Sequence, residues 1–200
     1  PVGDARVAPE FGKRFEVRGD VRSAVLQVSG LGFYEFRIDG VKVGDDVLTP
    51  NETSYGHRAG LGQHFISMSD SAWRQFRVFY QQYDVRHLLA RGVHQASAVV
   101  AGGVYSSTNR RWLHPYGSPR LWCRLVVCYK DGRSDTIATD TTWQVRRSPW
   151  VESDPFAGEV YDASAEGADR WRQAVRRQAP DGRLVLGDGP ADRVVERLRP

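Results

Sequence analysis

The sequence has little of what marks membrane, exported or nucleic-acid-binding proteins. No apolar run approaches the roughly 18 residues that cross a bilayer, and residues 1–10 lack the apolar core of a signal peptide. The net charge is +4, and the arginines cluster only in pairs: Arg110-Arg111, Arg146-Arg147 and Arg176-Arg177. A nucleic-acid binder more often gathers its basic residues on one face. We therefore expect neither a membrane nor a nucleic acid as a partner.

Cysteine is also scarce, since Cys123 and Cys128 are the two cysteines of the 200 residues. Both lie in one expected strand, where a spacing of five residues places them on opposite faces and about 16 Å apart. A disulfide requires Cα atoms within about 7 Å of each other, so we expect two free thiols. Free thiols fit a reducing compartment, which favours a cytoplasmic protein. Secretion stays an open alternative, because a signal segment ahead of residue 1 would have been removed.

What the sequence does contain is a series of short strand patterns in its first 160 residues. Five stretches contain alternating or β-branched apolar residues, and Gly, Asp-Gly or Pro turns separate them: 24–29, 33–38, 75–80, 95–101 and 121–129. Asp39-Gly40, followed by the apolar stretch 41–43, is typical of a β-hairpin with a tight turn. Helical periodicity is scarce before residue 165. The sequence therefore predicts an all-β fold, an antiparallel β-sandwich of jelly-roll or galactose-binding-like type.

The composition changes after residue 165. Residues 168–178 are compatible with one short helix, because two apolar residues lie four apart, and residues 193–198 are expected to form a strand without a sequential partner. We therefore expect residues 1–165 to form the sandwich domain. A short irregular extension, 166–200, would hold a linker and the first strand of a truncated following domain. A start at proline also suggests an excised segment.

Five motifs follow one another along the chain. They are Leu31-Gly32-Phe33-Tyr34-Glu35 leading to Asp39-Gly40 and Val43-Gly44-Asp45; Tyr83-Asp84-Val85 with Leu88-Leu89; Asp131-Gly132 with Asp140 and Trp143; Gly158-Glu159-Val160-Tyr161-Asp162-Ala163; and Gly189-Pro190 with Val194-Val195-Glu196. In order and spacing they resemble the N-terminal β-sandwich domain of bacterial α-L-rhamnosidases, together with the lead-in to the concanavalin-like domain that follows it. This chain differs from the family pattern at Gly103-Val104-Tyr105, at Ser164 and in the apparent insertion 60–73.

The resemblance implies a role for this chain as part of a larger enzyme. Enzymes of that family hydrolyse terminal α-L-rhamnosyl residues with inversion, and their two acidic residues lie in a helical barrel far downstream of the region resembled here. The chain is therefore expected to be a non-catalytic module that supports recognition of rhamnose-containing glycosides, with the downstream domains as further partners. A free-standing rhamnose- or carbohydrate-binding module and a purely structural domain stay open as alternatives, and an enzyme in itself ranks last.

An oxygen-rich loop is the first candidate site. Asp45, Asp46, Asn51 and Glu52 offer several of the six to eight oxygen ligands that calcium takes, and some members of the resembled family carry calcium-assisted rhamnose-binding modules. The spacing matches no EF-hand loop. The loop has two interpretations. It is either a calcium site whose ion binds sugar hydroxyls or a solvated turn.

A long loop rich in aromatic residues is the second candidate. Tyr105, Trp112, His114 and Tyr116 crowd this loop. Their rings could stack on the apolar faces of sugars while neighbouring polar groups form hydrogen bonds with the sugar hydroxyls. Packing of the loop against the edge of the sandwich is the alternative. Trp122 and Trp143 lie on expected strands and are assigned to the core.

An acidic pair is the third candidate. Glu159 and Asp162 lie three residues apart around Tyr161 and are included among the sugar-binding candidates. They could also form a carboxylate pair for acid–base chemistry. The favoured reading is structural, with both carboxylates accepting hydrogen bonds at a domain edge.

Overall fold

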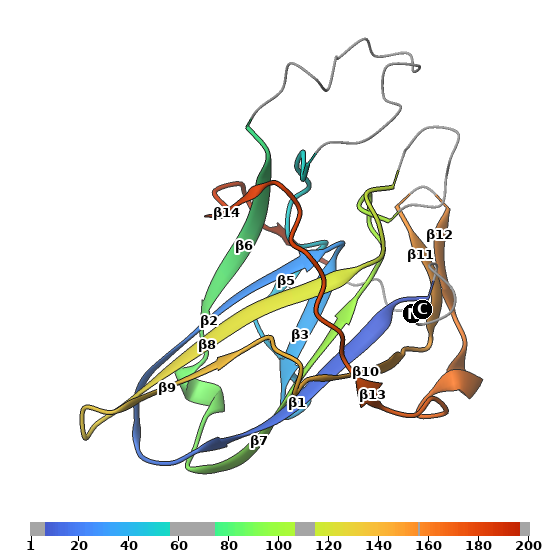
Figure 1. Ribbon diagram of the computed structural model, residues 1–200. Helices are drawn as coiled ribbons and strands as arrows, with labels where there is room; N and C mark the ends of the chain where they lie inside the picture. Colours follow the sequence, from blue (N-terminus) through green and yellow to red (C-terminus); the bar gives the residue numbers. More distant parts are fainter. Residues whose placement is uncertain (1–6, 57–74, 107–114, 156, 197–200) are drawn as a thin grey trace.

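The computed structural model describes residues 7–56, 75–106, 115–155 and 157–196, which form strands almost throughout (Figure 1). The helical elements of these ranges are two 3-10 turns, η2 (Arg86–Leu88) and η3 (Ala163–Ala165). Among the described residues, no helix has the length and apolar character that crossing a membrane requires. The all-β prediction is confirmed.

Two large sheets make up the body of the fold. In spatial order, the strands of the first are β13 (Arg172–Gln173), β10 (Gln144–Arg147), β1 (Pro9–Val17), β7 (Gly92–Val100), β3 (Tyr34–Ile38) and β4 (Val41–Lys42). The strands of the second are β14 (Arg183–Leu186), β6 (Arg77–Asp84), β2 (Val21–Leu31), β8 (Arg120–Tyr129) and β9 (Ser134–Ala138). Two short pairs join β11 (Trp150–Asp154) to β12 (Gly158–Tyr161), and β15 (Asp192–Arg193) to β5 (Asp46–Val47).

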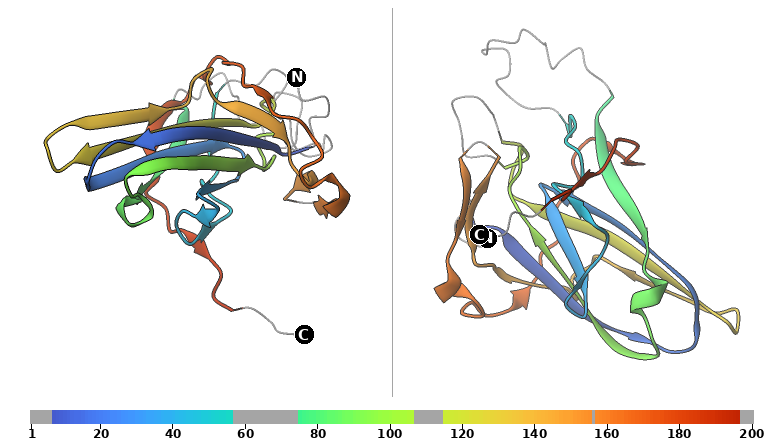
Figure 2. Two further views of the ribbon diagram at one scale, coloured as in Figure 1. Left: turned by 90° about the horizontal axis from the view of Figure 1, so that it is seen from below. Right: turned by 180° about the vertical axis from the view of Figure 1, so that it is seen from behind.

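The core lies between the two large sheets, because alternate residues of each strand point inward. In the first sheet, Phe36 of β3 and Ala98 of β7 are almost fully buried, and Leu26 of β2 and Val127 of β8 face them from the second. Strands β1 and β7 run side by side, as do β2 and β8 (Figure 2). The sandwich is thereby confirmed, whereas its more detailed description as a jelly roll or galactose-binding-like fold stays a prediction.

The hairpin predicted at Asp39-Gly40 is confirmed. Strands β3 and β4 pair in antiparallel orientation around it. Asp39 has φ 50° and Gly40 has φ 80°, and positive φ at both central residues is the signature of a type I′ turn, whose twist matches that of the flanking strands. The Asp39 carboxylate also accepts a 2.7 Å hydrogen bond from the backbone N–H of Gln95, which ties the turn to β7.

The C-terminal part of the chain lies against both sheets. Strand β13 extends the first sheet beside β10, and β14 pairs with β6 in parallel, the one parallel pairing among the described strands. Figure 1 shows this red segment passing from the edge of one sheet to the edge of the other. The short helix expected over 168–178 is wrong, because hydrogen bonding to β10 holds this backbone extended. The domain boundary at residue 165 stays a prediction.

Strand β8 carries both cysteines, and the prediction of two free thiols is confirmed. Cys123 faces the core and is buried, which raises the pKa of its thiol to about 12. Cys128 is half-buried on the same strand.

Trp143 belongs to the core, as predicted, but the assignment of Trp122 to the core is wrong. Trp122 precedes the inward-facing Cys123 on β8, so its side chain points outward. It is half-buried there and contacts Tyr80 edge-on, with ring centroids 5.9 Å apart.

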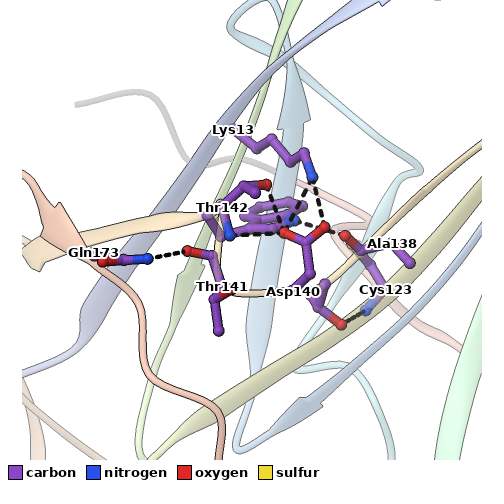
Figure 3. A network of polar contacts seen from close by, with 9 residues as sticks. Lys13, Cys123, Ala138, Asp140, Thr141, Thr142 and Gln173 are labelled. Atoms are coloured by element: carbon purple, nitrogen blue, oxygen red, sulfur yellow. Dashed lines mark hydrogen bonds and ion pairs between the residues drawn. The ribbon is translucent and has the colours of Figure 1, made fainter.

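A polar network spans the two sheets beside Trp143 (Figure 3). Lys13 of β1 places its Nζ atom 3.2 Å from both carboxylate oxygens of Asp140, which lies between β9 and β10. Asp140 also accepts hydrogen bonds from the hydroxyl and the backbone N–H of Thr142. The Thr142 hydroxyl, with smaller contributions from that N–H and from Lys13, holds the pKa of Asp140 below its usual value.

This network predicts an acid-sensitive contribution to stability. The folded-state pKa of Asp140 is depressed, so its stabilising effect is fully present above about pH 3.8 and is lost as the pH falls through the folded-state value. At neutral pH we expect Asp140→Asn to destabilise the fold by about 1 kcal/mol, a low value because the carboxylate side chain is 51% exposed and solvent screens it. Urea unfolding between pH 7 and 2.5 measures both effects.

The matched control is Asp20→Asn, which removes a carboxylate that is 75% exposed and lies 3.8 Å from Lys130. We expect this control to leave the curve of stability against pH almost unchanged. If the difference in stability between wild type and Asp140→Asn were the same at pH 7 and pH 2.5, Asp140 would not be the source of the acid sensitivity.

Candidate functional site

The two described members of the predicted aromatic site contact each other. Tyr105 and Tyr116 stack with ring centroids 5.6 Å apart and an angle of 13° between the ring planes. Tyr55, which the sequence did not single out, contacts both rings edge-on, with its ring centroid 5.1 Å from each of theirs. Trp112 and His114, the other two members, lie outside the described residues.

These tyrosines form a second, smaller core. Tyr55 and Tyr105 are each 2% exposed, and they pack with Leu31 and Val78 while Tyr116 lies against them. Burial raises the pKa of the Tyr55 and Tyr105 hydroxyls. Because the rings of Tyr55 and Tyr105 are covered by protein, they have no free face for a sugar to stack on. The described part of this cluster therefore fits the alternative reading, packing at the edge of the sandwich.

Asp45 and Asp46 of the predicted calcium loop both lie near Arg193, whereas Glu52 has a different partner. Asp46 accepts a 2.8 Å hydrogen bond from the Tyr83 hydroxyl, and the Arg193 guanidinium lies 3.3 Å from an oxygen of Asp45. Glu52 turns away to accept a 3.0 Å hydrogen bond from the backbone N–H of Val104, and burial raises its carboxyl pKa. A Cβ atom on Gly189 would lie 2.4 Å from the side-chain nitrogen of Asn51.

No three of the His, Cys, Asp and Glu side chains in the described ranges are placed to hold one metal ion. The carboxylates of Asp45, Asp46 and Glu52 therefore do not converge on one point in this arrangement. The contacts of Asp45 and Asp46 instead join β5 to β6 and to β15. Calcium binding by this loop stays a prediction.

The acidic pair makes local structural contacts. Glu159 lies on the exposed strand β12 and accepts a 3.1 Å hydrogen bond from the Ser153 hydroxyl of β11. Asp162 begins the turn η3, where its side chain accepts from the backbone N–H of Ser164 at 3.0 Å and from its hydroxyl at 2.6 Å. The two carboxylates thus stabilise a hairpin and a turn, in line with the favoured structural reading.

A shallow groove on the outer face of the first sheet was not found from the sequence. It has a volume of about 270 Å³, and the described residues that line it are Glu10, Glu35, Arg37, Ser97, Val99, Pro149 and Trp150. Its floor comes from the outward-facing residues of three adjacent strands. The β11–β12 hairpin stands beside the start of β1 (Figure 2), where the N–H of Ala8 donates to the carbonyl of Trp150 at 2.9 Å.

Strand register brings the floor residues together. Val99 of β7 is paired on one side with Glu10 of β1 and on the other with Glu35 of β3. Two residues along, Ser97 is paired with Arg37 of β3. Residues two apart on a strand share a face, so these rows form one continuous surface. In the sequence, the residues of the groove floor alternate with core residues along each strand. They lie up to 89 positions apart, so only the strand register shows them to be neighbours.

Ion pairs fix the charged side chains of the groove. Arg146 donates from Nε to Glu10 at 2.6 Å, and its guanidinium lies 4.5 Å from the ring centroid of Trp171. Arg37 donates from Nε to Glu35 at 2.8 Å and from Nη1 to the carbonyl of Gly40 at 2.7 Å. Each carboxylate therefore has its own guanidinium partner, and the two pairs together carry no net charge.

Comparison with known proteins shows the family of this chain. Residues 19–68 and 60–196 match the family model described as the α-L-rhamnosidase N-terminal domain. An α-L-rhamnosidase of Streptomyces avermitilis is 32% identical over 213 residues, which covers 96% of this chain and 19% of the relative. An α-L-rhamnosidase of Formosa agariphila is 28% identical over 174 residues, which covers 83% of this chain and 16% of the relative.

Solved structures agree with the sequence matches. The α-L-rhamnosidase of Aspergillus terreus superposes with a TM-score of 0.78 at 28% identity, over 98% of this chain and 22% of that one. The Streptomyces avermitilis α-L-rhamnosidase complexed with L-rhamnose gives a TM-score of 0.75 at 28% identity, over 96% of this chain and 18% of that one. The chain thus spans about a fifth of the length of the proteins that it matches.

Proposed function

The chain belongs to the family of α-L-rhamnosidase N-terminal domains, and on this premise we propose that it is a non-catalytic module of an α-L-rhamnosidase that supports recognition of a rhamnose-containing glycoside. The observation that carries the proposal is the extent of the match, which takes in 96% of this chain but only 19% of the Streptomyces avermitilis relative. Most of the relative, and hence most of the machinery of a hydrolase, lies outside the matched segment.

The contacts of the described motif residues support a non-catalytic role. Inverting glycoside hydrolysis uses two carboxylates roughly 6.5–9.5 Å apart, one of them a general acid. Glu159 and Asp162, the acids that the sequence suggested, hydrogen-bond to serines of their own hairpin and turn. Asp140 pairs with Lys13, and Trp143 fills the core. Each of these residues has a structural partner that accounts for its presence.

We expect no rhamnoside hydrolysis by the 200-residue chain, since its candidate acids are held in structural hydrogen bonds. The measurement is release of 4-nitrophenol from 4-nitrophenyl α-L-rhamnoside, compared with buffer alone. Glu159→Gln serves as the matched variant, because it keeps the shape of the side chain and removes its charge. Turnover by the wild type that disappears in Glu159→Gln would overturn the non-catalytic assignment.

A purely structural domain is the second candidate function. Burial of Tyr105 favours it, because this tyrosine, one of the two described residues that suggested sugar stacking, is almost fully covered by protein. The two functions differ in one observable: a recognition module binds L-rhamnose by itself, whereas a structural domain does not.

A further inference from the structure

The groove between β1, β3 and β7 has the chemistry of a site for a small neutral polyol. Its floor is apolar at Val99, and Trp150 and Pro149 give it an apolar wall. The hydroxyl of Ser97 and the ion-paired carboxylates of Glu10 and Glu35 place polar atoms around that apolar centre. Binding sites for small molecules typically combine an apolar surface with a few polar groups that fix the orientation of the ligand.

The charges of the groove select an uncharged ligand. Glu10 is paired with Nε of Arg146, and Glu35 with Nη2 of Arg37. The nitrogen–oxygen distance is 2.6 Å in each pair. Neither a cation nor an anion would gain an uncompensated partner. Each carboxylate uses one oxygen in its pair, and none of the described residues donates a hydrogen bond to the other oxygen. The remaining oxygens are acceptors suited to hydroxyl groups.

The polar side chains are held in place before any ligand arrives. Arg146 is fixed between Glu10 and the ring of Trp171, and Arg37 between Glu35 and the carbonyl of Gly40. The Trp150 ring is held by an edge contact with Tyr161 at 4.8 Å. Side chains that are already ordered cost little further entropy on binding, so even a shallow groove can bind at millimolar concentrations.

We propose that this groove binds a single neutral pyranose ring, with its apolar face on Val99 and Trp150 and its hydroxyls donating to Glu10 and Glu35. The volume of about 270 Å³ lies just below the range of roughly 300–1,000 Å³ for drug-sized ligands, which fits one ring and no more. The proposal rests on the recognition role proposed above and assigns it to a site that needs no metal ion. Among the described residues, none of the sugar-binding candidates suggested by the sequence lines this groove.

The test is titration of the full 200-residue chain with L-rhamnose, followed by amide and indole N–H chemical shifts. We expect a dissociation constant of the order of 1 mM, with the largest shifts at Ser97, Val99 and the indole of Trp150. Val99→Arg places a long cationic side chain between Glu10 and Glu35, where it pairs with them and fills the groove. We expect this variant to bind L-rhamnose at least tenfold more weakly.

Val93→Arg is the matched control, because Val93 is 59% exposed on the same face of the same strand and does not line the groove. It should bind L-rhamnose as the wild type does. Ser97→Ala is a second variant that keeps the shape of the floor and removes one hydroxyl, so it reports on the groove even where Val99→Arg fails to fold. We expect it to weaken binding two- to fivefold.

The outcomes separate the groove from the wider function. If Val99→Arg and Ser97→Ala bound L-rhamnose as strongly as the wild type, the groove would not be the binding site. The proposed recognition role would then still stand. No shifts at about 50 mM L-rhamnose would overturn both the groove and the recognition role. Loss of binding in Val99→Arg but not in Val93→Arg would establish the site.

Discussion

Replacing Gly32 with alanine is expected to destabilise the protein by roughly 3 kcal/mol or more, because overpacking and an unfavourable backbone conformation act together. Gly32 has φ +114°, and a Cβ atom there would lie 2.0 Å from the carbonyl oxygen of Ala101. The contact is between two backbone segments, so no side-chain rotation relieves it. The N–H of Ala101 donates to the carbonyl of Phe33 at 2.7 Å, which holds the two segments together at this point.

Gly92→Ala separates the two causes. Gly92 has φ +138°, and a Cβ atom at this position would meet no atom within 4 Å. This variant therefore introduces conformational strain alone, for which roughly 1–2 kcal/mol is expected. Equilibrium unfolding in urea compares the two variants with the wild type. Equal destabilisation in Gly32→Ala and Gly92→Ala would mean that the close approach of Ala101 has no energetic consequence.

Trp143→Ala is expected to cost about 3–5 kcal/mol, the range for removing a large aromatic side chain from a core. The Trp143 side chain packs between the sheets with 2% of the residue exposed, and its Nε1–H donates to the carbonyl of Ala138 at 2.9 Å. Its backbone carbonyl accepts from the N–H of Ala174 at 2.9 Å. The residue therefore connects β9, β10 and the C-terminal segment through one position.

Two further variants divide that cost into packing and hydrogen bonding. Trp143→Phe keeps most of the aromatic volume and loses the hydrogen bond to Ala138, so we expect a loss of about 1–2 kcal/mol. Trp122→Ala removes a half-buried indole from the outer face and is expected to cost less than half as much as Trp143→Ala. Midpoints and slopes of denaturant unfolding give these values. A cost for Trp122→Ala as large as for Trp143→Ala would contradict the outward placement of Trp122.

The motifs that identify the family turn out to mark structural positions. Gly32 permits a close backbone approach, Asp39 and Gly40 form a type I′ turn, and Asp162 caps a 3-10 turn. Asp140 anchors a network that Lys13 completes from the other sheet. Such positions tolerate few residue types because their backbone conformation or burial is demanding. This explains how a chain that shows the family so clearly gives little information about a binding site.

Local patterns determined much of the fold. Alternating or β-branched apolar residues predicted strands at 24–29, 33–38 and 121–129, and each stretch lies in or overlaps a strand of the structure. Asp39-Gly40 predicted its hairpin, because its φ angles depend on the two residues themselves. The same local reasoning failed at 168–178, where a helix-like spacing was overruled by pairing of Arg172 and Gln173 with β10.

The sequence by itself determined the fold class, the family and the free state of both cysteines, since each depends on spacing along the chain. Only the tertiary structure decided which polar residues become neighbours. Glu10, Val99 and Glu35 share one row of a sheet, and Lys13 meets Asp140 across 127 positions. Strand order and register bring such residues together, and both depend on the packing of the whole core rather than on any local pattern.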